Sequence, residues 1–224
     1  MKPTEVVKRY LLFIVSLLFA AFGVAVTKHA ELGVSPISST ANVLSCKFTA
    51  LSLGVWLILW NCVLILGQLL ILRRQFQPIQ LLQLPLSLLF GWFTDLGMAC
   101  VAAIPVPNYP VRLLLVLCGI ILLGFGISLS VIANVILNSG EAFVTAISDV
   151  SGKNFGDLKI AFDVCCVVLA LLLSLLFFQG KIIGTREGTI LTALLTGLVV
   201  KRFVRLLQSP LERRLSGNAP QISA

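Results

Sequence analysis

The 224-residue chain is too apolar for a soluble protein, because 58% of its residues are hydrophobic and only 12% are charged, whereas soluble domains are about a quarter charged. Its mean hydropathy is +1.04, and 17 lysines and arginines against 9 acidic residues give a net charge of +8. These bases flank apolar segments instead of forming a stripe on a water-facing domain, which excludes a nucleic-acid partner. Composition therefore predicts an integral membrane protein in contact with the lipid bilayer.

Six apolar segments along the chain approach or exceed the length of a membrane-spanning helix, about 20 residues. They cover residues 10–27, 51–72, 81–104, 113–137, 160–178 and 188–207. The first is interpreted as a retained helix, since no small-residue cleavage site of a secretory signal follows it. The third and fifth carry one acid each, Asp95 and Asp163, while Lys201, Arg202 and Arg205 crowd the end of the sixth. We predict an all-α, polytopic transmembrane protein with about six spans.

The basic residues predict the orientation of these spans. With a cytoplasmic N-terminus, 12 of the 17 lysines and arginines fall on the inner side of a six-span chain, in agreement with the positive-inside rule. The five on the outer side are Lys28, Lys47, Arg112, Lys181 and Arg186. The sequence therefore predicts a plasma-membrane protein with both termini in the cytoplasm.

Two polar interruptions, at residues 33–46 and 138–151, each follow one span and precede two more. Paired interruptions of this kind indicate a binding site near the bilayer midplane. Pro36 suits the first turn of a helix, and Ser35 and Ser139 are residue types that cap helix N-termini. As re-entrant half-helices, the two segments would direct positive N-terminal ends at an anionic group. The alternative is that both are short helices lying on the membrane surface.

A shift of 103 positions places Gly23 on Gly126 and, with small gaps, Gly54 on Gly156 and Gly91 on Gly197. The same alignment places Asn61 on Asp163 and Asp95 on Lys201. Residues 1–105 and 106–209 then form two three-span repeats, followed by a cytoplasmic tail at 210–224. Two units with an odd number of spans must have opposite orientations, which predicts an inverted 3+3 repeat. Accidental similarity of apolar segments is the alternative.

The ionisable residues inside the spans have few predicted partners. An ion pair between Asp95 and Lys201 would join the two halves. Glu141, in the second interruption, is either a contact for substrate or coupling ion or a solvated loop acid. His29 has no neighbouring ligands for a zinc site, and the six cysteines are interpreted as packing residues. We expect no metal and no cofactor.

The segment Ala30-x-x-Gly33-x-x-Pro36, the matching later interruption and the Gly-Thr steps before the final glycine-containing helix resemble the bacterial YczE/YyaS/YitT group of membrane proteins. The resemblance covers most of residues 10–205. It implies a bacterial inner-membrane protein of about this size. It does not name a substrate.

These patterns favour a secondary transporter of a small polar or anionic metabolite, working by alternating access, and not an enzyme. The chain has no nucleotide-binding motif, so an H+ or Na+ gradient would drive transport. The candidate substrate-binding residues are Ser35, Pro36, Ser38, Ser39, Asn42, Asn61, Ser139, Glu141, Thr145 and Asp163. The alternative is a non-transporting scaffold or regulatory subunit that binds its partner through the basic residues of 202–214. Assembly into a homo-oligomer is left open.

Overall fold

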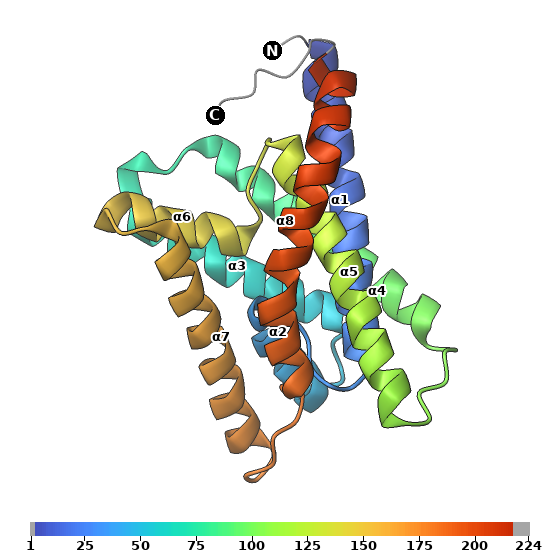
Figure 1. The fold of residues 1–224 in the computed structure, drawn as a ribbon. Coiled ribbons are helices and arrows are strands. Elements are labelled where there is room, and N and C mark those ends of the chain that lie inside the picture. The colour runs from blue at the N-terminus through green and yellow to red at the C-terminus, as the bar shows by residue number, and fades with distance from the viewer. Residues whose placement is uncertain (1–2, 217–224) are drawn as a thin grey trace.

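The structure, a computed structural model, describes residues 3–216 as eight α-helices and two short 3-10 turns, with no strand among them. The helices are α1 (Pro3–His29), α2 (Pro36–Lys47), α3 (Leu53–Leu72), α4 (Gln83–Val101), α5 (Tyr109–Ala133), α6 (Ser139–Ser151), α7 (Phe155–Phe177) and α8 (Glu187–Ser216). The turns η1 (Arg73–Gln75) and η2 (Pro78–Leu82) join α3 to α4. Figure 1 shows the arrangement. The predicted all-helical fold is confirmed.

Five of the described helices are long and apolar enough to cross a membrane: α1, α3, α4, α5 and α7. The helix α8 has 30 residues and is not one of the five, because Lys201, Arg202 and Arg205 interrupt its apolar part. The 12 residues of α2 and the 13 of α6 give helices about 18 to 20 Å long. They are too short to cross about 30 Å of hydrocarbon. Each short helix thus follows one long helix and precedes two more, as the polar interruptions predict.

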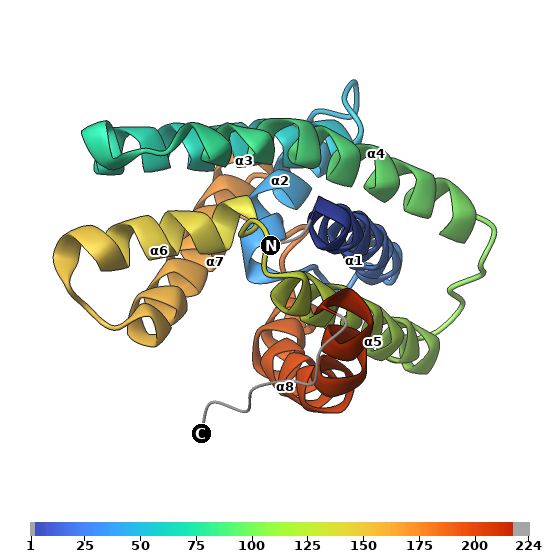
Figure 2. The same cartoon turned by 90° about the horizontal axis from the view of Figure 1, so that it is seen from above.

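The centre of the fold is the close pair α1 and α5 (Figure 2). A Cβ atom on Gly23 would lie 2.5 Å from the Leu123 backbone nitrogen, and one on Gly126 would meet the Ala20 backbone nitrogen. Glycines at such positions allow two helix backbones to approach closely. Gly23 corresponds to Gly126 under the 103-residue shift, and Ala20 corresponds to Leu123. The same backbone contact therefore occurs twice, once from each half of the chain.

Most other contacts between helices also occur twice, once for each half of the chain. Helix α4 packs on α1 as α8 packs on α5, α2 packs on α7 as α6 packs on α3, and α2 packs on α3 as α6 packs on α7. The most extensive pair without a counterpart is α3 and α4. Helices α3 and α4 pack closely against each other, whereas α7 and α8 make no comparable contact within the described residues and stand apart in Figure 1.

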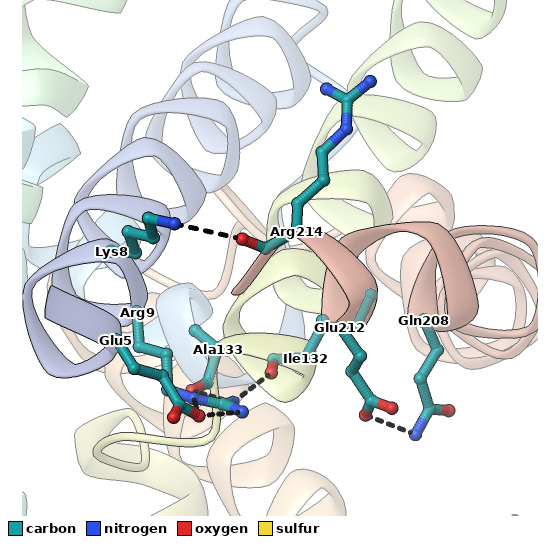
Figure 3. A network of polar contacts seen from close by, with 8 residues as sticks. All are labelled: Glu5, Lys8, Arg9, Ile132, Ala133, Gln208, Glu212 and Arg214. Carbon is teal, nitrogen blue, oxygen red and sulfur yellow. Dashed lines mark hydrogen bonds and ion pairs between the residues drawn. The ribbon is translucent and has the colours of Figure 1, made fainter. Parts of the chain in front are cut away.

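The beginning of α1 and the end of α8 lie at the same end of the molecule (Figure 3). The Lys8 ammonium group donates a hydrogen bond of 3.2 Å to the Arg214 carbonyl. Arg9 pairs with Glu5 at 3.0 Å and donates to the carbonyls of Ile132 and Ala133 at the end of α5. Residues 217–224 of the predicted tail lie outside the described residues.

The shared position of the two chain ends predicts the result of a labelling experiment. In a variant without the six native cysteines, single cysteines at Arg74 and Arg214 should react with a membrane-impermeant maleimide only after the cells are permeabilised, because positive-inside orientation places both in the cytoplasm. A cysteine at exposed Asn108, between α4 and α5, is the control and should react in intact cells. Labelling of Arg74 and Arg214 from opposite sides would contradict both the orientation and the inverted repeat.

Candidate functional site

A cavity of about 670 Å³ lies where the N-terminal ends of α2 and α6 meet, and all eight helices contribute to its wall. Most of the lining is apolar, with Leu57, Phe90 and Leu123 among the larger side chains. A few polar groups converge on it from the two short helices. Such a cavity, apolar with a few placed polar groups, is typical of a small-molecule site.

The two short helices touch each other at their first turns. A Cβ atom on Gly140 would lie 2.8 Å from Cδ1 of Ile37, and these two residues correspond under the 103-residue shift. Neither N-cap residue, Ser35 nor Asn138, bonds through its side chain to the backbone N–H groups of its own helix. By contrast, the N-cap side chains of α3, α5 and α7 do so. Two helix ends with positive partial charge therefore meet at the cavity.

Helix α2 lies in the interior of the protein. Pro36 and the residues from Ser38 to Val43 are buried, between α3, α7 and α8. The hydroxyl groups of Ser39 and Thr40 lie 3.4 and 3.5 Å from the Cys166 carbonyl in α7. A helix covered in this way by other helices does not lie on the outside of the protein.

Glutamine side chains hold the start of α6 in place. Gln68 of α3 and Gln83 of α4 exchange two amide hydrogen bonds of 3.1 Å, and Gln68 also donates to the Ser139 carbonyl at 3.1 Å. The Ser87 and Ser139 hydroxyls lie 3.3 Å apart. Sequence reasoning passed over these glutamines. The signal was present, because Gln68, like Asn61, is a polar side chain inside a largely apolar span, where it requires a partner.

Three titratable side chains line the cavity: Glu141, Lys159 and Asp163. The Lys159 ammonium group and the Asp163 carboxylate form an ion pair of 2.5 Å along α7. The Glu141 carboxyl group accepts hydrogen bonds from the backbone and the side chain of Asn138, which is the reach-back of a capping box. Glu141 therefore partly neutralises the positive partial charge at the N-terminus of its own helix, α6. Helix α2 has no acidic residue in its first turn.

Seven of the ten predicted site residues line this one cavity, although they come from four helices. They are Ser35, Pro36, Ser38, Asn61, Ser139, Glu141 and Asp163. Trp60, Ser87, Ser130 and Thr196 also line it and were not predicted. The cavity thus joins the two polar interruptions with the matched positions Asn61 and Asp163.

The other three predicted residues lie outside the cavity. Ser39 donates to the Pro36 carbonyl, Asn42 donates to the Gly184 carbonyl at 2.5 Å, and Thr145 donates to the Glu141 carbonyl. The reason is helical geometry. Ser35 and Ser38 share the face of α2 that meets the cavity, whereas Ser39 is rotated toward α7, and Asn42 is a turn further from the site.

The predicted ion pair between Asp95 and Lys201 does not form. Asp95 instead accepts hydrogen bonds from the Ser52 hydroxyl at 2.5 Å and from the Gly54 backbone N–H at 2.8 Å. Lys201 is exposed, with no ion pair among residues 3–216. Helices α4 and α8 lie on opposite sides of the central pair α1 and α5 (Figure 2), so their side chains cannot meet.

Comparison with known proteins gives one family and one curated relative. A family described as "Family of unknown function (DUF6198)" matches residues 7–205. The chain is similar to the "Uncharacterized membrane protein YczE" of Bacillus subtilis (strain 168), with 27% identity over 216 residues that cover 94% of each chain. No solved structure matches the chain. The resemblance to the YczE group and the membrane nature of the protein are confirmed.

Proposed function

This chain belongs to the family of unknown function DUF6198, and we propose that it is an integral membrane secondary transporter of a small polar or anionic metabolite. The main support for this proposal is the cavity at the point where the N-terminal ends of α2 and α6 meet. Half-helices whose N-terminal ends meet around a central site are the construction of many secondary carriers. The bacterial inner membrane is its proposed location, with both termini in the cytoplasm.

The proposed transport mechanism is alternating access between two inverted halves. The doubled contact of Gly23 with Leu123 and of Gly126 with Ala20 supports this, because a local two-fold axis between two related halves would produce such a repeated contact. The contact between Ile37 and Gly140 lies between corresponding residues, as expected on such an axis. In this proposal α8 is the sixth span, and α2 and α6 are re-entrant.

The two ends of the site have different proposed roles. The first turn of α2 carries no acid, so its N–H groups and the hydroxyls of Ser35 and Ser38 would receive the anionic or polar part of the substrate. Glu141 stands on the opposite helix, and Lys159 and Asp163 neutralise each other. The Glu141 carboxylate is then the group that would take a coupling ion, H+ or Na+, or a positive part of the substrate. We propose transport and not catalysis for these residues.

Thermal unfolding of the purified protein against a panel of metabolites tests the proposal. A ligand that binds only the folded state adds about 2.7 kcal/mol to the free energy of unfolding at 100 times its Kd, and the melting temperature therefore rises. We expect stabilisation by at least one small polar or anionic compound, and uptake of that compound by proteoliposomes with an ion gradient. A panel in which compounds bind but none crosses the membrane would contradict transport and favour a scaffold or sensor.

A further inference from the structure

We infer that α7 and α8 close against each other at Gly156 and Gly197, in a second arrangement of the protein that repeats the present α3–α4 contact at Gly54 and Gly91. The inference rests on the proposed function, since closure there is what exposes the cavity to alternate sides of the membrane. It names the residues that form the second gate.

The first-half contact is closed in this structure. A Cβ atom on Gly54 would meet the Gly91 carbonyl oxygen, and one on Gly91 would lie 2.6 Å from the Gly54 carbonyl oxygen and from Ile58. Asp95 fixes the contact, because its carboxylate accepts hydrogen bonds from the Ser52 hydroxyl and the Gly54 N–H. Two helix backbones can approach so closely only where both carry small residues.

The second half has the same residue types in an open arrangement. Within residues 3–216 and apart from its own helix backbone, Gly156 has Oδ1 of Asn154, at 3.1 Å, as the one atom within 4 Å of its Cβ position, and Gly197 has none. Under the alignment of the two halves, Gly156 corresponds to Gly54 and Gly197 to Gly91. These two glycines therefore have no packing role in the present arrangement, although their counterparts allow α3 and α4 to pack closely.

The α3–α4 contact also predicts which neighbours meet on closure. Ile58 packs on Gly91, and its counterpart on α7 is Ile160, which is largely exposed. Ser52 and Asp95 correspond to Asn154 and Lys201. Each of Ser52 and Asn154 caps its own helix, and a Lys201 ammonium group can donate to the Asn154 side-chain oxygen where Asp95 accepts from Ser52.

Both helices that would move line the cavity, α7 through Ile160 and Asp163 and α8 through Thr196 and Gly197. Gly156 is the second residue of α7 and Gly54 the second residue of α3. In Figure 1, α7 begins at its end nearer the start of α1, whereas α3 begins at its end farther from it. With the orientation proposed above, α3 and α4 are in contact toward the outer end and α7 and α8 stand apart toward the inner end, and the inferred arrangement reverses both.

The experiment uses the full chain in proteoliposomes, with its six native cysteines replaced and new cysteines at Asn154 and Lys201. We expect a disulfide between them under mild oxidation, since the closed contact brings both within bonding distance. The matched control pairs Asn154 with a cysteine at Val199, which packs on Gly124 of α5 and faces away from α7, so no disulfide should form. No disulfide in the Asn154–Lys201 pair, with no short-distance population between spin labels at these exposed sites, would overturn the inference.

A second variant tests the glycine contact itself. Gly197→Val has free space in the present arrangement, so its melting temperature should equal that of the parent, but the valine should obstruct closure and lower the cross-linked fraction about tenfold. Unchanged cross-linking in Gly197→Val would mean that the helices meet elsewhere and would refute the glycine contact. Ligand binding is measured separately, so a protein that cross-links but binds no metabolite would count against the transporter proposal and not against this closure.

Discussion

Replacing Gly23 by valine should lower the free energy of unfolding by about 3 kcal/mol or more, because the added side chain must push apart two backbones in the centre of the fold. Its Cβ atom alone would lie 2.5 Å from the Leu123 nitrogen and 2.7 Å from its Cα atom. Backbone atoms cannot rotate away as side-chain ends do. Thermal unfolding in detergent, followed by the fraction that remains monodisperse, measures the loss.

The matched control for this substitution is Gly197→Val, which adds the same atoms to a glycine of α8 with open space around it. Its melting temperature should remain close to that of the parent protein. The corresponding substitution on the other central helix, Gly126→Val, should be as harmful as Gly23→Val, since it meets the Ala20 backbone. Equal stability of all three variants would show that α1 and α5 do not pack as described.

Replacing Glu141 by glutamine should have the second large effect, a loss of ligand binding. A carboxylate among helices is retained only where a ligand, an ion or a partner offsets its cost, so removal of the charge should weaken binding of the stabilising metabolite or its coupling ion about tenfold or more. Ser38→Ala, on the opposite short helix, should weaken it by a smaller factor. Isothermal titration with the compound found in the thermal panel measures both.

Thr145→Ala is the control for this pair, because Thr145 lies one turn after Glu141 but outside the cavity. Its affinity should match that of the parent. In the cysteine-free background, single cysteines at Ser38 and Glu141 should react with a water-soluble thiol reagent, and saturating ligand should protect both. Unchanged binding in both Ser38→Ala and Glu141→Gln would remove the cavity as the substrate site.

Sequence reasoning located the long helices and both short ones, because apolar length and polar interruption are local properties of the chain. It also singled out Ser35, Ser38 and Glu141, which line one cavity, because two polar interruptions at matching places in the chain are visible without a structure. The orientation of Ser39 toward α7 could not be predicted, because it depends on which neighbour covers which side of a short helix that is buried on most of its surface.

Side-chain contacts between helices were harder to predict than the helices themselves. Asp95 and Lys201 correspond in the alignment, and opposite charges suggested a pair, but correspondence in an inverted repeat places residues at equivalent sites, not at adjacent ones. The amide exchange between Gln68 and Gln83 connects two helices across a turn. Its geometry depends on how α3 lies against α4, a tertiary contact that no periodicity in either helix specifies.

The bases of α8 bear on how the protein is assembled during synthesis. Lys201, Arg202 and Arg205 lie within the part of α8 that runs along α5, where Phe203 stacks edge-on against Phe125 at 5.3 Å between ring centroids. An isolated helix pays roughly 2.5 to 3.5 kcal/mol to insert each such residue at its centre, so α8 is a poor substrate for the insertion machinery on hydrophobicity alone. Its docking onto α5 and α1 offsets that cost. In the proposal that α8 is the sixth span, its membrane integration would therefore depend on α5 and α1, which are made earlier.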